Sequence, residues 1–272
     1  MTDEPSDHIP ADWARPTPAR VEKAAAFAML ALASDSPWPV QDRLRSYYRR
    51  DGNYAGASFA EMQPNPVRDV VAADLHAVTL LAVMVKPRAT RRLLDDCGHR
   101  SEVLTALAEV DELGVTSLPD AGHDVLVAMD RLFRAVRSAC QDPDAGASNP
   151  WVTASKLCAR KRPGLFPVRD TTVCTALGLI GAGMPQGDWQ LDWQVYQQLL
   201  EHPGVWRGLD AAIGYVSSLP RPEFAGDAHP LRIFDAALWT YESQRLRQLR
   251  QQANAARKVR RPAPVRTGQQ ES

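Results

Sequence analysis

The sequence has little of what marks disulfide-rich, metal-binding, secreted or membrane proteins. Its four cysteines stand 43, 18 and 16 residues apart and form no C-x-x-C pair, which is typical of reduced thiols rather than of a disulfide framework or a zinc site. The first twelve residues lack the basic start and apolar run of a secretory signal. The longest apolar stretch, residues 70–85, is broken by Asp74 and His76. We therefore expect a soluble cytoplasmic protein with no metal, no cofactor and no membrane contact.

Several catalytic signatures are also missing. The sequence contains no G-x-S-x-G, no P-loop, no H-E-x-x-H and no G-x-G-x-x-G, so hydrolase, zinc-protease and nucleotide-binding hypotheses have no starting residue. Lysine and arginine number 32 and so do aspartate and glutamate, which leaves a net charge of zero that indicates no partner.

The residues that are present favour helices. Isoleucine occurs four times, alanine is abundant, and apolar residues recur at steps of three and four, with most of the 21 prolines between the periodic runs. We predict a single all-α, multi-helix domain over residues 17–243, with a disordered segment over 1–16 and a basic helix end and tail over 244–272. The turn-forming segment 141–150 is the best candidate for an internal boundary.

Three features inside the predicted domain give sharper expectations. Thr17 and Pro18 form a typical helix start. Residues 67–85 are apolar on nearly all sides and predict the central helix of the fold. Asp74 and Asp235 lie among apolar residues, and a buried carboxylate must be paired or hydrogen-bonded. We expect each to pair with an arginine, either Arg232 or one from residues 160–169; a polar pocket is the alternative.

The most unusual segment covers residues 151–179. Five basic residues accumulate in it before any acid, and helical spacing would put the first two on one face. This predicts a compact cationic patch that is either a solvated turn or a set of phosphate contacts. We call it the 156–169 patch, and its members are Lys156, Arg160, Lys161, Arg162 and Arg169. Asp170 follows at an expected helix start, where it is either an N-cap or a functional carboxylate.

Residues Phe166–Val173, closed by Ala176–Leu179, resemble the Pro-Val-Asp-Thr-x-Val…Leu-Gly stretch of helix-hairpin-helix DNA glycosylases. In those enzymes the aspartate is catalytic, and in bifunctional members a lysine upstream attacks the sugar to form a Schiff base. Carried over by position, the resemblance implies that Asp170 is the catalytic aspartate and Lys156 the candidate nucleophile. It also implies a glycosylase-like helical fold.

The glycine-rich turn by which that family holds a DNA phosphate has no counterpart, because Asn149-Pro150-Trp151 occupies its place. We therefore expect a degenerate member that binds without cutting. The chain is also similar to an uncharacterised bacterial family of unknown function. That resemblance rests on the blocks AADLHAVTLLAV, ASKLCARKRPGLFPVRD and PLRIFDAALW, which together span most of residues 40–240.

The C-terminal residues 243–272 hold eight basic residues against Glu271 alone, and such a segment prefers polyanions. A solvated tail, an acidic partner and the protein's own acidic body are the alternatives. The predicted nucleic-acid contacts are Arg160, Lys161, Arg162, Arg169, Arg257, Lys258, Arg260 and Arg261.

Three functions stay open. The first is nucleic-acid binding by a degenerate glycosylase-like protein. The second is a non-catalytic helical module that binds another protein, and the third is an active glycosylase on a damaged base. Five tryptophans crowd the C-terminal half, where core packing explains most of them and base stacking would need at least one to be exposed. They are Trp151, Trp189, Trp193, Trp206 and Trp239.

Overall fold

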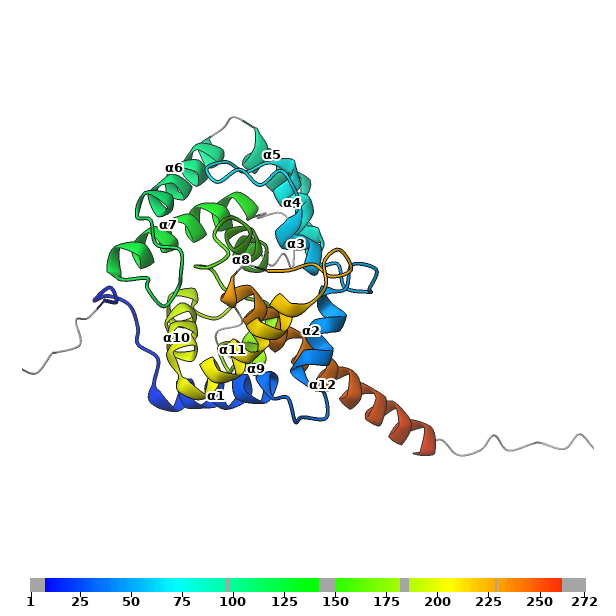
Figure 1. Cartoon of the computed structure of the whole chain (residues 1–272). Helices are drawn as coiled ribbons and strands as arrows, with labels where there is room; N and C mark the ends of the chain where they lie inside the picture. Colours follow the sequence, from blue (N-terminus) through cyan, green and yellow to red (C-terminus); the bar gives the residue numbers. More distant parts are fainter. Residues whose placement is uncertain (1–7, 96–97, 142–149, 182–185, 228, 261–272) are drawn as a thin grey trace, which may run out of the picture.

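The chain folds as one all-α domain, as predicted, in a computed structural model that describes residues 8–95, 98–141, 150–181, 186–227 and 229–260 (Figure 1). Within these residues there is no β-strand, and an isolated bridge joins Arg49 and Phe224. The helices there are α1 (Pro18–Leu32), α2 (Val40–Tyr48), α3 (Ala57–Glu61), α4 (Ala72–Thr79), α5 (Pro87–Leu94), α6 (Gly98–Glu112), α7 (His123–Cys140), α8 (Pro150–Lys161), α9 (Thr171–Ala176), α10 (Trp189–Glu201), α11 (Pro203–Ser218) and α12 (Pro230–Arg260).

Two predicted helix starts are confirmed. The Thr17 hydroxyl accepts a hydrogen bond from the Arg20 amide at 3.3 Å, and Pro18 opens α1. The Asp170 carboxylate accepts from the Val173 amide at 2.8 Å and caps α9. Both side chains satisfy amides that a helix start leaves without an intrahelical acceptor.

The basic helix α8 lies at the centre of the fold. Every residue from Trp151 to Lys161 is buried, and the helix packs against α7 and α4 (Figure 1). A fully buried helix is normally apolar all round, whereas α8 brings Lys156, Arg160 and Lys161 into the interior. Their positions are possible only because each finds protein acceptors there, as described below.

The prediction of one central helix over residues 67–85 is wrong. Only α4 is helical in this range; the Asp74 carboxylate accepts from the Val71 amide at 3.0 Å near its start. Turns follow at 80–82, where Ala82 has φ 58°, and the chain then runs without regular structure to α5. An all-round apolar pattern indicates burial but does not separate a helix from an irregular buried segment.

The N-terminal end of the described chain differs from the prediction of a disordered segment over residues 1–16. Residues 8–16 belong to the segment predicted to be disordered, yet Trp13 is buried against Trp193 with ring centroids 6.2 Å apart. At the other end, α12 begins in the core and then projects from the body (Figure 1). The possible boundary at 141–150 lies, apart from its two end residues, outside the described residues, and the flanking helices α7 and α8 pack together.

Candidate functional site

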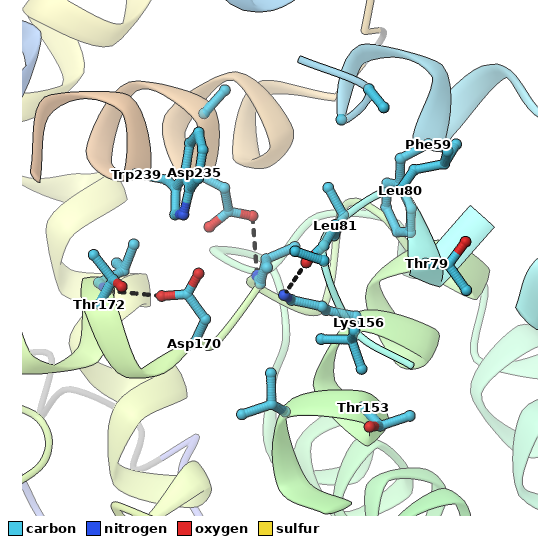
Figure 2. Close-up of a pocket in the computed structure, with 18 of the residues that line it drawn as sticks. Phe59, Thr79, Leu80, Leu81, Thr153, Lys156, Asp170, Thr172, Asp235 and Trp239 are labelled. Atoms are coloured by element: carbon cyan, nitrogen blue, oxygen red, sulfur yellow. Dashed lines mark hydrogen bonds between the residues drawn. The ribbon is translucent and has the colours of Figure 1, made fainter. Parts of the chain in front are cut away.

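A cavity of about 830 Å³ lies where α2, α3, α8, α9 and α12 meet (Figure 2). The end of α4, the irregular segment 80–86 and the loop 53–56 form further parts of its wall. Pockets for small organic ligands have volumes of about 300–1,000 Å³, so this one is large enough for a ring-containing ligand. Residues 80–84 and Lys86, in the part of segment 67–85 that is not helical and in the residue after it, line the cavity.

Lys156 enters the cavity from α8. Its ammonium donates to the Leu81 carbonyl at 2.7 Å, and only 5% of the residue is exposed. Burial lowers the pKa of this lysine, and the nearby carboxylate of Asp170 opposes that effect. An amine whose pKa is lowered in this way is closer to the neutral, nucleophilic form than a solvated lysine is.

Asp170 enters the same cavity from the start of α9, and Figure 2 shows both side chains pointing into one space. Burial raises the pKa of Asp170, while the Val173 amide and the Lys156 ammonium both act to lower it. The N-cap role and a place in the cavity are therefore not alternatives for this residue: one oxygen caps α9 and the side chain lines the cavity.

Aromatic side chains form another wall of the cavity. Tyr54 lies 5.7 Å from Trp239 and 6.0 Å from Tyr47 between ring centroids. Trp239 is half-buried and lines the cavity. Trp206 is exposed, but it does not line this cavity. Rings of this kind offer apolar surfaces on which a flat ligand can stack.

A second polar group reaches the cavity from α12 and the residues before it. Arg232 and Asp235 form an ion pair at 2.6 Å, and Asp235 also accepts from the Val168 amide at 3.0 Å. Burial raises the pKa of Asp235 and of the neighbouring Asp227 to about 6, against the opposing charge of Arg232. The predicted pairing of Asp235 with Arg232 is confirmed, and Asp235 also lies in a polar pocket.

Arg160 and Lys161 do not form the exposed patch that was expected. Both contact the fully buried carboxylate of Asp74, at 3.2 Å and 3.0 Å. Arg160 also donates to the carbonyls of residues 59, 60 and 62, and Lys161 donates to the Asn65 side chain at 2.7 Å. The predicted pairing of Asp74 with this segment is confirmed. Because these cations are buried and bound to protein acceptors, the expectation that they are solvated or open to phosphate is corrected.

Arg162 and Arg169 are also held inside the protein. Arg169 is fully buried, and its Nε donates to the Asp192 carboxylate at 2.8 Å. Arg162 is half-buried, pairs with Asp111 at 3.2 Å and donates to the Leu107 carbonyl at 3.1 Å. Neither residue lines the cavity. Of the 156–169 patch, Lys156 alone reaches the site.

The remaining predicted contacts lie at the end of α12. The helix continues through Arg257, Lys258 and Arg260, whose side chains are not described, and Arg261 lies outside the described residues. Arg247 and Arg250, just before them, are exposed.

The described residues hold no group of three or more His, Cys, Asp and Glu side chains placed to bind a metal ion. Among the described helices, none is long and apolar enough to cross a bilayer. Cys140, Cys158 and Cys174 are buried free thiols. The side chains that line the cavity include amines, carboxylates, a guanidinium group, phenols, hydroxyls and one thiol.

Residues 40–242 match the model of DUF6308, a family of unknown function. The chain belongs to this family. No curated protein and no solved structure matches it. The DUF6308 range contains every residue that lines the cavity, from Tyr47 to Trp239, whereas the exposed Arg245, Arg247 and Arg250 of α12 lie beyond it.

Sequence reasoning found Lys156 and Asp170 but missed the polar group on α12. Asp235 was singled out as a buried carboxylate, and its sequence neighbour Arg232 as a partner, yet nothing in the spacing linked them to Lys156. The only available signal was a pair of charges three residues apart inside an apolar helix. Tyr48 and Asp227 gave no signal at all.

Proposed function

We propose that this protein binds nucleic acid and admits one unstacked base to the cavity, as a degenerate glycosylase-like protein. The observation that supports this most is the shared position of Lys156 and Asp170 on one cavity. These are the two residues that the resemblance to helix-hairpin-helix glycosylases pairs. A lysine buried next to a carboxylate beside an open space is unusual for a residue with only a structural role, because its desolvation lowers stability.

The shape and walls of the cavity suit a flat heterocycle. Tyr54 and Trp239 provide ring surfaces, and stacking of a base on an aromatic side chain contributes about 1–3 kcal/mol. The volume of about 830 Å³ leaves room for a base together with part of its sugar. Such a base must first leave its stack, which is easiest in single strands or at unpaired positions.

Other cations than the buried ones must then contact phosphates. Lys86 lines the cavity at the start of α5, and Arg88 and Arg91 lie on the exposed face of that helix. Arg247 and Arg250 are exposed on the projecting half of α12. Contacts from these side chains to phosphates do not depend on base sequence. They weaken as the salt concentration rises, because the release of counterions from the nucleic acid then contributes less free energy.

The test is equilibrium binding by fluorescence anisotropy. The probes are a single strand, a paired duplex and a duplex with one unpaired base. We expect the duplex with the unpaired base to bind more tightly than the paired one. Affinity should fall about a hundredfold between roughly 50 and 200 mM salt if about four phosphates are contacted. If no probe binds at low salt, the proposal is wrong and the protein-interaction module becomes the better hypothesis.

Base excision by an active glycosylase, through a covalent imine, is a second candidate, favoured by the position of Lys156 in the cavity with Asp170 and by its lowered pKa. In this reaction the neutral amine forms a bond to C1′ of the sugar while the bond from C1′ to the base breaks. One amine proton goes to the departing base and the other to O4′ as the C1′–O4′ bond breaks and the sugar ring opens, which leaves an imine between the lysine and C1′. Borohydride reduces that imine to a stable amine, so protein and DNA remain joined.

Lys86 provides the matched control for this reaction, because it also lines the cavity. An abasic site presents C1′ as an aldehyde, with which the amine forms the same imine and releases water. A borohydride adduct with such DNA should form with wild type and Lys86→Arg and be lost in Lys156→Arg. An adduct that survives in Lys156→Arg would contradict the role of Lys156. The absence of any adduct would leave base binding as the proposed function.

A further inference from the structure

Three residues that line the cavity carry buried polar atoms that have no partner within the described residues. They are Nη1 of Arg232, Oδ1 of Asp235 and the hydroxyl of Tyr48. All three residues line the cavity and are more than nine-tenths buried. A buried polar atom without a hydrogen bond costs free energy, so each one calls for an explanation.

The free atoms of the pair are held in a fixed relation to each other. The other ends of both side chains are occupied, because Nη2 of Arg232 and Oδ2 of Asp235 form their ion pair at 2.6 Å. Oδ2 of Asp235 also accepts from the Val168 amide, and Nε of Arg232 donates to the Pro163 carbonyl at 3.1 Å. Figure 2 shows the Asp235 carboxylate between Trp239 and Asp170, at the edge of the open space. The ion pair therefore presents one hydrogen-bond acceptor and one donor in fixed positions.

We propose that Asp235 and Arg232 recognise the hydrogen-bonding edge of a heterocycle in the cavity, with Oδ1 of Asp235 accepting from an N–H group and Nη1 of Arg232 donating to a neighbouring oxygen or nitrogen. The Tyr48 hydroxyl is the third contact and can donate or accept. This inference rests on the proposed function, because it assumes a base in the cavity. It adds what the cavity selects: a ring that carries a donor next to an acceptor, rather than any flat apolar ring.

A second buried pair elsewhere in the protein provides a matched control. Arg169 and Asp192 are also joined by their charged ends, and Nη1 of Arg169 and Oδ1 of Asp192 also have no partner within the described residues. Neither of these residues lines the cavity. Changes to this pair should alter stability as changes to Arg232 and Asp235 do, without altering selection in the cavity.

The experiment measures anisotropy of duplexes that carry one unpaired thymine, guanine, adenine or cytosine, or a nonpolar isostere of thymine with fluorine in place of oxygen. We expect wild type to prefer unpaired thymine over the isostere by about tenfold or more, since a site built for hydrogen bonds rejects a ligand that lacks them. The four natural bases show whether a ring amide or an amino group next to a ring nitrogen is preferred.

Asp235→Leu should reduce this preference to about threefold or less, and Asp192→Leu should leave it unchanged. Since either single change can prevent folding by leaving an arginine uncompensated, the double variant Arg232→Met/Asp235→Leu is measured beside Arg169→Met/Asp192→Leu. A wild-type protein that binds thymine and isostere equally overturns the inference while the proposed function stands. Equal preference in the wild type and the Arg232→Met/Asp235→Leu variant also overturns it. If wild type binds no probe, the proposed function fails and this inference fails with it.

Discussion

Helix α8 contains two kinds of buried cation within six residues. Arg160 and Lys161 share the Asp74 carboxylate, which balances one of their two charges, and several neutral protein oxygens accept from their remaining donors. Lys156 contacts the Leu81 carbonyl and faces the cavity, with Asp170 nearby. The first kind of cation holds the fold together, whereas the ammonium of Lys156 keeps hydrogen-bond donors that are free for a ligand in the cavity. Burial alone therefore does not separate a structural cation from a functional one; the completeness of its contacts does.

The largest effect that this comparison predicts is on stability. Asp74→Ala leaves Arg160 and Lys161 buried without their carboxylate, and removal of one partner from such a group costs about 3–5 kcal/mol. Asp51 pairs with Arg49 at the surface and provides the control, since exposed pairs contribute about 0–1 kcal/mol. Urea unfolding measures both. A loss below about 1 kcal/mol for Asp74→Ala would mean that the buried pairing does not hold the fold.

The second prediction concerns pH and the carboxylates of the cavity. Burial raises the pKa of Asp235 from 3.8 to about 6, so the folded protein holds this proton more tightly than the unfolded chain does. The associated stability is complete below pH 3.8 and is lost as pH rises through about 6. The free energy of unfolding of wild type relative to Asp235→Asn should therefore decrease by on the order of 2 kcal/mol over this range. A difference that stays constant or increases with pH would contradict the raised pKa.

The third prediction separates function from stability at Lys156. Lys156→Met should weaken binding of a duplex with one unpaired base by about tenfold, which corresponds to about 1.4 kcal/mol. Because the buried ammonium makes one hydrogen bond to a carbonyl, its replacement by an apolar side chain of similar length should leave stability unchanged or raise it. The two measurements are anisotropy and urea unfolding of the same preparation. Unchanged binding together with a marked loss of stability would make Lys156 a structural cation like its neighbours.

The smallest effect is expected at Asp170. Asp170→Ala removes the N-cap of α9 and should cost about 1 kcal/mol, whereas Asp170→Asn keeps a capping side chain and should cost less. If the carboxylate also acts in the cavity, Asp170→Asn will weaken binding of the unpaired base despite its intact cap. Equal binding by Asp170→Asn and wild type would restrict Asp170 to the capping role.

Local features of the fold could be predicted from the sequence, because they depend on neighbours along the chain. The caps at Thr17 and Asp170 follow from the residue types at helix starts. The need of Asp74 and Asp235 for cationic partners follows from their apolar surroundings. The pairing of Lys156 with Asp170 was predicted from a resemblance over about thirty residues and not from their spacing.

Long-range features could not be predicted in this way. The burial of Arg160 depends on Asp74, which is 86 residues away, and that of Arg169, just before α9, depends on Asp192 in α10. A basic run with no acid nearby is normally a solvated surface, and only the three-dimensional arrangement shows that distant carboxylates neutralise it. The prediction of one helix over the apolar segment 67–85 was wrong because a hydrophobic pattern indicates burial but does not determine the backbone conformation.

The most direct test of the account is where an unstacked base lies in the complex. A duplex with one unpaired 4-thiothymine is irradiated with the protein, and the crosslinked residues are located by mass spectrometry. We expect crosslinks to the cavity wall, at Tyr54 or Trp239, and expect them to decrease in Lys156→Met. Crosslinks confined to the exposed end of α12, with none in the cavity, would show that the protein holds DNA without admitting a base and would contradict the central claim.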